Sequence, residues 1–142
     1  MFRLIALLGA FTLYAAPSLG ETVLGRNYVL FDGRADTSQP APLVIAMHGF
    51  LSSANNIRKK TGFNRLATRH GFIVAYPNGK ARRWNDGRSP RNRTDDVAFV
   101  SAMIAKLVAS GHAKPRQVFV AGHSNGGGMA MRMACELSLI HI

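Results

Sequence analysis

Cysteine is nearly absent from this sequence, since Cys135 is the only one in 142 residues. One cysteine cannot build a disulfide framework or a cysteine-based zinc site, and we interpret it as a small apolar residue on a helix. Acidic residues are also scarce, with 7 Asp and Glu against 18 Lys and Arg and a formal net charge of +11. This charge would suit an anionic partner, but the basic residues are mostly dispersed and no nucleic-acid-binding motif is present. We therefore expect no nucleic acid partner.

Long apolar runs are missing beyond the N-terminus. Residues 4–16 are almost wholly apolar, follow Arg3 and precede the small-residue stretch 18–20, a pattern typical of a cleaved export signal. This run is too short to span a bilayer. We expect a signal peptide at residues 1–20, one domain at residues 21–142, and export without membrane insertion. A buried N-terminal helix is the alternative.

Short apolar runs alternate with helical patterns along the chain. The runs typical of strands are residues 28–31, 43–47, 72–76 and 118–121. One helical pattern fills residues 55–70, and the residues available for its inner face are Ile57, Phe63, Leu66 and Ala67. A second fills residues 95–110, capped by Thr94 or Asp95. This alternation predicts an α/β fold with a mostly parallel sheet and flanking helices.

The pattern Gly122-His123-Ser124-Asn125-Gly126 directly follows the last apolar run. G-x-S-x-G between a strand and a helix predicts a nucleophile elbow, a sharp turn that projects the serine hydroxyl from the sheet. Glycine two residues before and after the serine lets the strand and the helix pass closely. Ser124 is therefore the candidate nucleophile, and helix N-terminal amides beside it can stabilise negative charge. A plain glycine-rich turn is the alternative.

An oxyanion hole is expected beside this serine. His48-Gly49-Phe50 follows an earlier apolar run. In this architecture the loop after that strand and the residue after the nucleophile each provide one backbone N–H. The expected donors are the amides of Phe50 and Asn125. The alternative for His48-Gly49 is a tight strand exit, and we expect His48 to shape the loop rather than act as a base.

A general base and its acid are missing from their expected places. In α/β-hydrolases the order along the chain is nucleophile, acid, histidine. Among acidic residues and histidines, only Glu136 and His141 follow Ser124. If the intervening segment is helical, His141 would lie about 25 Å from Ser124. Asp95 and Asp96 precede the serine, and helix capping is expected to explain them. The triad Asp and His are therefore expected to be absent from this chain.

A basic loop surrounds the only tryptophan, Trp84. Arg82, Arg83 and Arg88 lie beside it in the sequence. An exposed tryptophan among arginines suggests a stacking wall for a substrate or a contact site for an anionic partner. The alternative is a solvated loop held together by Asp86 and local turns.

Together these residues resemble the secreted bacterial polyhydroxybutyrate depolymerase-like and feruloyl esterase family of α/β-hydrolases. The stretches that carry the resemblance, in order and spacing, are residues 42–49, 69–77, 84–88, 95–97 and 118–136. The resemblance implies a serine esterase without metal or organic cofactor, acting on polyester or on aromatic or acetyl esters of plant cell-wall polysaccharide. It also implies Ser124 as nucleophile, with Phe50 and Asn125 as oxyanion donors.

The sequence departs from this family at its end. Similar proteins continue past the position of Glu136 through strands that carry the catalytic Asp and His, and residues 137–142 do not resemble that continuation. We therefore expect the N-terminal portion of an esterase, inactive as this fragment, with residues 118–121 left as an exposed sheet edge. The alternative is a non-catalytic secreted protein that binds an anionic polymer through the Trp84 loop. A lipase-like enzyme shares the elbow, and the choice of ester and the oligomeric state stay open.

Overall fold

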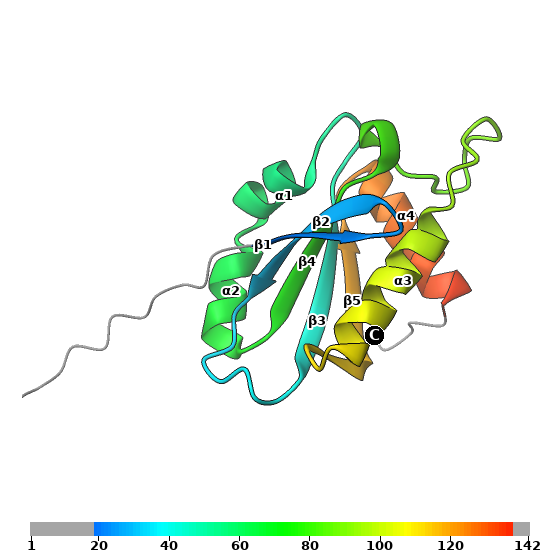
Figure 1. The fold of residues 1–142 in the computed structure, drawn as a ribbon. Coiled ribbons are helices and arrows are strands. Elements are labelled where there is room, and N and C mark those ends of the chain that lie inside the picture. Colours follow the sequence, from blue (N-terminus) through cyan, green and yellow to red (C-terminus); the bar gives the residue numbers. More distant parts are fainter. Residues whose placement is uncertain (1–18, 138–142) are drawn as a thin grey trace, which may run out of the picture.

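The computed structural model describes residues 19–137, so most of the predicted signal peptide and His141 lie outside the described residues. In chain order the elements are β1 (Leu19–Val23), β2 (Arg26–Asp32), β3 (Ala41–Met47), α1 (Ala54–Thr61), α2 (Phe63–His70), β4 (Ile73–Pro77), the 3₁₀ helix η1 (Lys80–Arg82), α3 (Asp96–Ala109), β5 (Ala113–Gly122) and α4 (Asn125–Glu136). The described strands form one sheet in the order β1-β2-β4-β3-β5 (Figure 1). β3 runs parallel to β4 and β5, whereas β1, β2 and β4 pair in antiparallel fashion. The predicted α/β class is confirmed, and the sheet is mixed.

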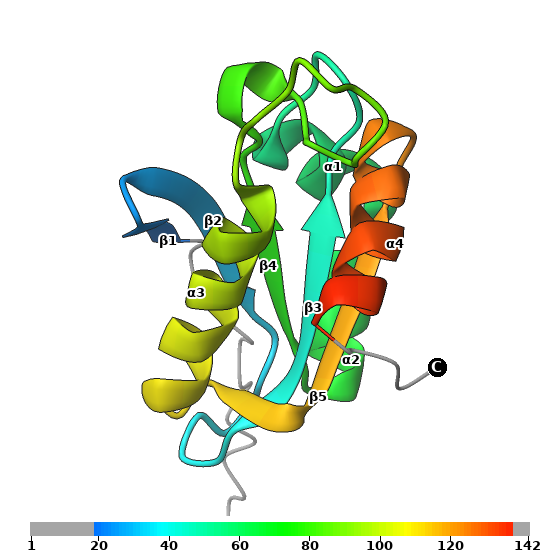
Figure 2. The same ribbon diagram turned by 90° about the vertical axis from the view of Figure 1, so that its right-hand side faces the viewer.

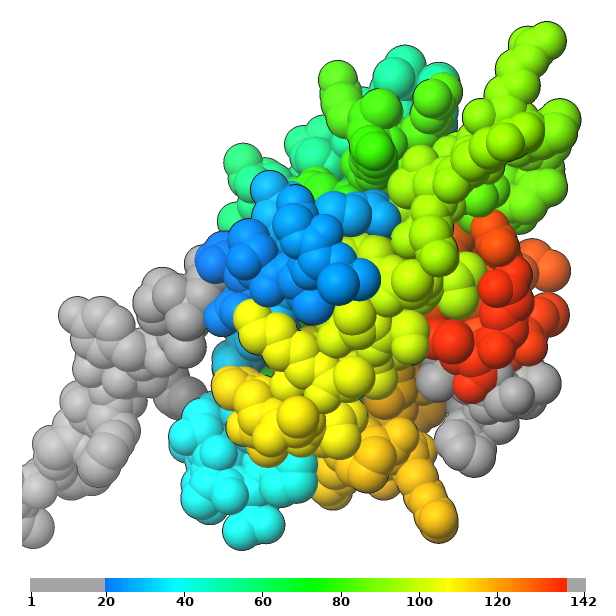
Figure 3. All heavy atoms as spheres, turned by 45° about the vertical axis from the view of Figure 1, so that its right-hand side comes forward, coloured from blue at the N-terminus to red at the C-terminus, as the bar shows by residue number. Residues whose placement is uncertain are grey.

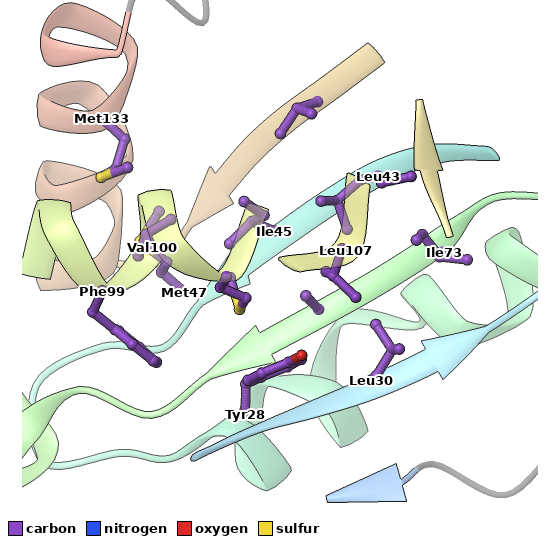
Figure 4. Packing of buried hydrophobic residues seen from close by; sticks show 14 of the residues in the cluster. Tyr28, Leu30, Leu43, Ile45, Met47, Ile73, Phe99, Val100, Leu107 and Met133 are labelled. Carbon is purple, nitrogen blue, oxygen red and sulfur yellow. The ribbon is translucent and has the colours of Figure 1, made fainter. Parts of the chain in front are cut away.

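Helices cover both faces of this sheet, with α3 and α4 on one face and α1 and α2 on the other (Figure 2). Side chains of a strand alternate between its two faces. Accordingly, Leu43, Ile45 and Met47 of β3 pack toward α3 and α4 (Figure 4). Val44 and Ala46 of the same strand pack in the second cluster, with the residues of α1 and α2. Both faces of β3 are thus buried, as expected for a central parallel strand.

The helix predicted over residues 55–70 is in fact two helices. Gly62 ends α1 and begins α2 with φ 67° and ψ 8°, a left-handed conformation that glycine adopts at little cost. This break turns the second half of the segment, so that Ala67 is buried while Leu66 is 38% exposed. Ile57 and Ala67 are buried and Phe63 packs against the core, as predicted, whereas the prediction for Leu66 was wrong because it assumed one continuous helix.

A short hairpin formed by β1 and β2 was not predicted. Leu24 and Gly25 connect the strands with φ values of 49° and 69°, the positive angles of a two-residue hairpin turn. β1 begins at Leu19 and therefore overlaps the last two residues of the predicted signal peptide. The signal peptide and its boundary stay predictions.

β5 lies at one edge of the described sheet, as expected from the sequence. Phe119 in its middle is 43% exposed, which leaves apolar surface on this strand. Within residues 19–137, none of the helices has the length and apolar content required to cross a bilayer.

On the described strands, the carboxyl ends of β3 and β5 lie side by side, with Met47 opposite Gly122. This pairing brings the loop after β3 next to the predicted elbow.

Candidate active site

Ser124 occupies a sharp turn between β5 and α4. Its φ of 55° and ψ of −119° are unfavourable for a residue with a side chain. A Cβ on Gly122 would lie 2.1 Å from the Gly126 carbonyl oxygen, and one on Gly126 would lie 2.3 Å from that of Met47. Both glycines are therefore required by close backbone contacts. Ser124 is exposed, and its hydroxyl forms no hydrogen bond to another described residue.

The loop after β3 lies directly against this turn. His123 N–H donates to the Met47 carbonyl at 3.1 Å, and a Cβ on Gly49 would lie 3.0 Å from His123 Nδ1. Phe50 and Ser124 line the same two hollows in the surface. Within the described chain, the backbone amides of Phe50 and Asn125 donate to no carbonyl oxygen. Two backbone donors beside Ser124 are thus unused by the fold itself.

Buried His48 stabilises this loop through hydrogen bonds. It is 1% exposed, its Nδ1 donates to the Gly49 carbonyl at 2.8 Å, and its Nε2 accepts the Gly79 N–H at 3.0 Å. Because Nε2 accepts, the ring proton resides on Nδ1. Burial lowers the pKa of His48 below its usual value. A neutral His48 therefore uses both ring nitrogens to connect the loops after β3 and β4, which leaves neither nitrogen for Ser124.

The lowered pKa of His48 predicts that the folded chain loses stability in mild acid. An unperturbed histidine titrates near pH 6.5, whereas buried His48 stays neutral to lower pH. Below about pH 6.5 the unfolded chain thus binds more protons, and the free energy of unfolding falls until the pKa of folded His48 is reached. Urea unfolding at about pH 7.5 and about pH 5.5 measures this loss, and His48→Gln is expected to reduce it.

An unchanged pH dependence in His48→Gln would contradict this assignment. Asp32 and Asp86 do not confuse the comparison, because hydrogen bonds from Arg34 and Arg88 hold their carboxyl pKa values below the usual 3.8. Their contributions to stability are therefore lost only at more acidic pH.

Trp84 is buried, which corrects the prediction of an exposed stacking wall. Its side chain is 2% exposed, and its indole N–H donates to the His48 carbonyl at 2.8 Å. Its backbone N–H donates to Asn125 Oδ1 at 2.8 Å, and Asn125 Nδ2 donates back to the Trp84 carbonyl at 3.1 Å. Trp84 therefore joins the loop after β3 to the start of α4. Contact of this residue with a substrate stays a prediction.

Asn125 has a side-chain role that the sequence reasoning missed. Besides Trp84, its Nδ2 donates to Asp86 Oδ2 at 2.8 Å. A Cβ on Gly128 would lie 2.9 Å from the same oxygen, so Asp86 packs closely on the first turn of α4. The G-x-S-x-G spacing does not reveal this contact, because it depends on a loop about forty residues earlier in the sequence.

Asp95 and Asp96 differ in role, although both were expected to cap a helix. Asp95 is the N-cap of α3, as predicted, and its Oδ1 accepts the Ala98 N–H at 2.9 Å. Asp96 is fully buried, pairs with Arg26 at 2.7 Å and accepts the Asn85 N–H at 2.6 Å. The capping explanation is therefore wrong for Asp96, which instead anchors the Trp84 loop to β2.

Backbone strain concentrates around the site. Of five non-glycine residues with positive φ in residues 19–137, four lie in the loops after β3 and β4 or at the turn after β5, namely Leu51, Ala81, Arg82 and Ser124. Leu51 N–H donates to the Arg82 carbonyl at 2.8 Å, and the Arg82 guanidinium donates to the Leu51 carbonyl. These bonds connect the loops after β3 and β4 and stabilise the strained conformations.

Two hollows adjoin Ser124. One, of about 460 Å³, extends toward Ile57 and Lys60 of α1. The other, of about 440 Å³, lies between the Trp84 loop and the start of α4. In Figure 3 the green segments, which include the loop after β4, cover the upper end of the molecule beside α4. Phe50, 57% exposed, stands between the two hollows and lines both. Among residues 19–137, no cluster of His, Cys, Asp and Glu is suited to hold a metal ion.

Comparison with known proteins finds relatives that are similar to this chain in sequence. The chain is 30% identical over 102 residues to feruloyl esterase B of Piromyces equi, covering 69% of this chain and 19% of that protein. It is 27% identical over 107 residues to the poly(3-hydroxybutyrate) depolymerase of Ralstonia pickettii, covering 66% of this chain and 22% of that protein. The chain thus spans less than a quarter of either relative.

Solved structures share the fold. The acetyl xylan esterase from Aspergillus awamori superposes with a TM-score of 0.71 at 19% identity, covering 86% of this chain and 48% of that one. The S-formylglutathione hydrolase from Staphylococcus aureus superposes with a TM-score of 0.68 at 20% identity, covering 86% of this chain and 52% of that one. The model of one family, esterase PHB depolymerase, matches residues 26–141. That match includes the elbow, the loop after β3 and the Trp84 loop, and the chain therefore belongs to the esterase PHB depolymerase family.

Proposed function

We propose that this chain is the nucleophile-bearing portion of a secreted serine carboxyl-ester hydrolase. The observation that carries the proposal is the strained turn at Ser124, beside which the amides of Phe50 and Asn125 are unused. An exposed serine next to two free backbone donors suits acyl transfer, because the donors can stabilise the oxyanion of the tetrahedral intermediate. Export rests on the predicted signal peptide.

In the proposed reaction, Ser124 Oγ attacks the ester carbonyl and its proton passes to a general base. The amides of Phe50 and Asn125 hold the oxyanion until the alcohol leaves with a proton, and water then hydrolyses the acyl-enzyme. His48 is unsuited as the base because both of its ring nitrogens are occupied. We propose that the triad His and Asp come from chain outside residues 19–137, so that the fragment alone is inactive.

The proposed substrates are polyesters or esters of polysaccharide. The names of the relatives support this class, since they include a feruloyl esterase and a poly(3-hydroxybutyrate) depolymerase. A substrate could enter the two hollows on either side of Phe50, which meet at Ser124. Exposed Phe50, which lines both hollows, adds apolar surface beside Ser124, which suits a substrate with apolar parts.

A purely polymer-binding role for the Trp84 loop has less support. Arg82 donates to the loop after β3, and Arg88 pairs with Asp86. Two of the three arginines expected to contact an anionic polymer are thus engaged within the protein. Buried Trp84 offers no exposed face for stacking.

Trapping the acyl-enzyme tests the proposal directly. The complete protein is mixed with p-nitrophenyl acetate, quenched in acid and digested with trypsin. We expect one acetyl group on the tryptic peptide of residues 117–132, in which Ser124 is the only serine. Fragmentation of this peptide distinguishes Ser124 from His123. Acetylation at His123, or no adduct despite release of p-nitrophenol, would contradict a Ser124 acyl-enzyme.

A further inference from the structure

Cationic side chains surround both hollows at Ser124. Lys60 lines the hollow toward α1, and Arg83 and Arg88 line the hollow beside the Trp84 loop. The one carboxylate that lines either hollow in the described chain is Asp86. The charge next to the proposed nucleophile is therefore positive on both sides.

Asp86 offsets the charge of Arg88, with which it pairs, and leaves the charge of Arg83 uncompensated. Its side chain is 6% exposed and accepts hydrogen bonds from the Arg88 guanidinium, the Arg88 backbone and Asn125 Nδ2. Arg83, by contrast, is exposed, and its side chain makes no hydrogen bond or ion pair within residues 19–137. Arg83 is thus a guanidinium in the hollow that the fold itself does not use.

The position of Arg83 is well defined, although its side chain is free. Its backbone N–H donates to the Lys80 carbonyl at 3.2 Å, and a Cβ on Gly79 would lie 2.4 Å from the Arg83 carbonyl oxygen. The next residue, Trp84, is buried and bonded to Asn125. The backbone that carries the guanidinium is therefore held on both sides, close to the start of α4.

We propose that the hollow beside the Trp84 loop binds a free carboxylate on one arm of the ester substrate, with Arg83 as the residue that contacts it. The proposal rests on the proposed ester hydrolysis at Ser124. An arginine presents paired N–H donors that match a carboxylate, and the polar side chains of Ser89 and Asn92 line the same hollow. The ligand class is an ester with a carboxylate a few bonds from the scissile carbonyl.

Two kinds of ester carry such a carboxylate. In an oligomer of a hydroxy acid the free end places it on the alcohol arm, whereas a half-ester of a dicarboxylic acid places it on the acyl arm. The test therefore uses both: the 3-hydroxybutyrate dimer against its terminal carboxamide, and the p-nitrophenyl half-ester of adipic acid, which is too long to cleave itself through a small cyclic anhydride, against p-nitrophenyl hexanoate. Each pair differs chiefly in one negative charge.

The measurement is the ratio of kcat/KM for the charged and the neutral ester of each pair, made on the complete protein. We expect the charged ester to be preferred by about threefold to fivefold in at least one pair, with the preference reduced by added salt. Arg83→Gln should abolish most of this preference. Arg116→Gln, which removes the same charge from an exposed position on β5, is the matched control and should retain it.

A ratio near one in both pairs, or an equal loss of preference in Arg83→Gln and Arg116→Gln, would overturn the carboxylate site. Ser124-dependent hydrolysis of the neutral esters would then still support the proposed function. If no ester is hydrolysed, the proposed function fails, and calorimetric titration of the dimer acid and its carboxamide into wild-type and Arg83→Gln protein decides the binding claim. Equal affinity for acid and carboxamide in the wild-type protein would overturn it.

Discussion

Replacing Ser124 by alanine is expected to lower kcat for ester hydrolysis by about 10⁴-fold or more in the complete protein. The change removes the attacking oxygen, and no acyl-enzyme can form without it. Both proposed oxyanion amides remain, because they belong to the backbone. The residual rate is thus expected to reflect transition-state stabilisation by these amides alone. Initial rates with p-nitrophenyl acetate and with a feruloyl ester measure the loss.

Ser110→Ala is the matched control for this experiment. Ser110 follows α3 at the opposite end of β5, and its hydroxyl contacts His112 Nδ1 at 2.8 Å rather than any residue of the site. Its activity should equal that of the wild-type protein. The Ser124→Ala variant must also unfold at the same urea concentration as wild type, which shows that the fold is intact. Retention of more than about a tenth of the wild-type rate in a folded Ser124→Ala variant would refute the nucleophile assignment.

Gly122→Ala is expected to lower the free energy of unfolding by about 3 kcal/mol or more. The added methyl group would lie 2.1 Å from the carbonyl oxygen of Gly126 and 2.6 Å from the nitrogen of Gly127. These are backbone atoms at the start of α4, so they cannot move aside as a flexible side chain would. The strand and the helix would have to separate, and the contacts of α4 with the sheet would weaken. Urea unfolding followed by circular dichroism measures the change.

Gly127→Ala, in the first turn of α4, is the matched control. A Cβ on Gly127 would have its nearest contact at 3.2 Å, with the Gly122 carbonyl oxygen. Alanine also favours a helix over glycine by about 1 kcal/mol, which offsets this tight contact. We therefore expect a change within about 1 kcal/mol of wild type. Equal destabilisation by the two substitutions would contradict the close-contact explanation for Gly122.

Much of the fold could be predicted because its signals are local. The apolar runs at residues 43–47 and 118–121 lie in β3 and β5, the run at residues 72–76 overlaps β4 in all but its first residue, and Asp95 caps α3 as expected. The elements that were missed depend on single turns. Gly62 breaks a segment that otherwise has a helical pattern. The two-residue turn at Gly25 creates a hairpin whose first strand has too few apolar residues to be predicted from the sequence.

The roles of polar and aromatic loop residues were harder to predict, because they depend on partners far along the chain. Trp84 was expected at the surface among arginines, yet its indole finds an acceptor in the His48 carbonyl and is buried. Asp96 was expected to cap a helix, yet it pairs with Arg26 of β2. In both cases the neighbouring sequence gave no sign of the partner.

The sequence by itself determined the α/β class, the strand–turn–helix around Ser124 and the two glycines that permit it. These features follow from apolar periodicity and from local backbone sterics, which act over a few residues. Only the tertiary structure decided how the loop after β3 is held, through His48, Trp84 and the Leu51–Arg82 hydrogen bonds. Buried polar groups require partners, and which partners are available depends on the packing of segments distant in the sequence.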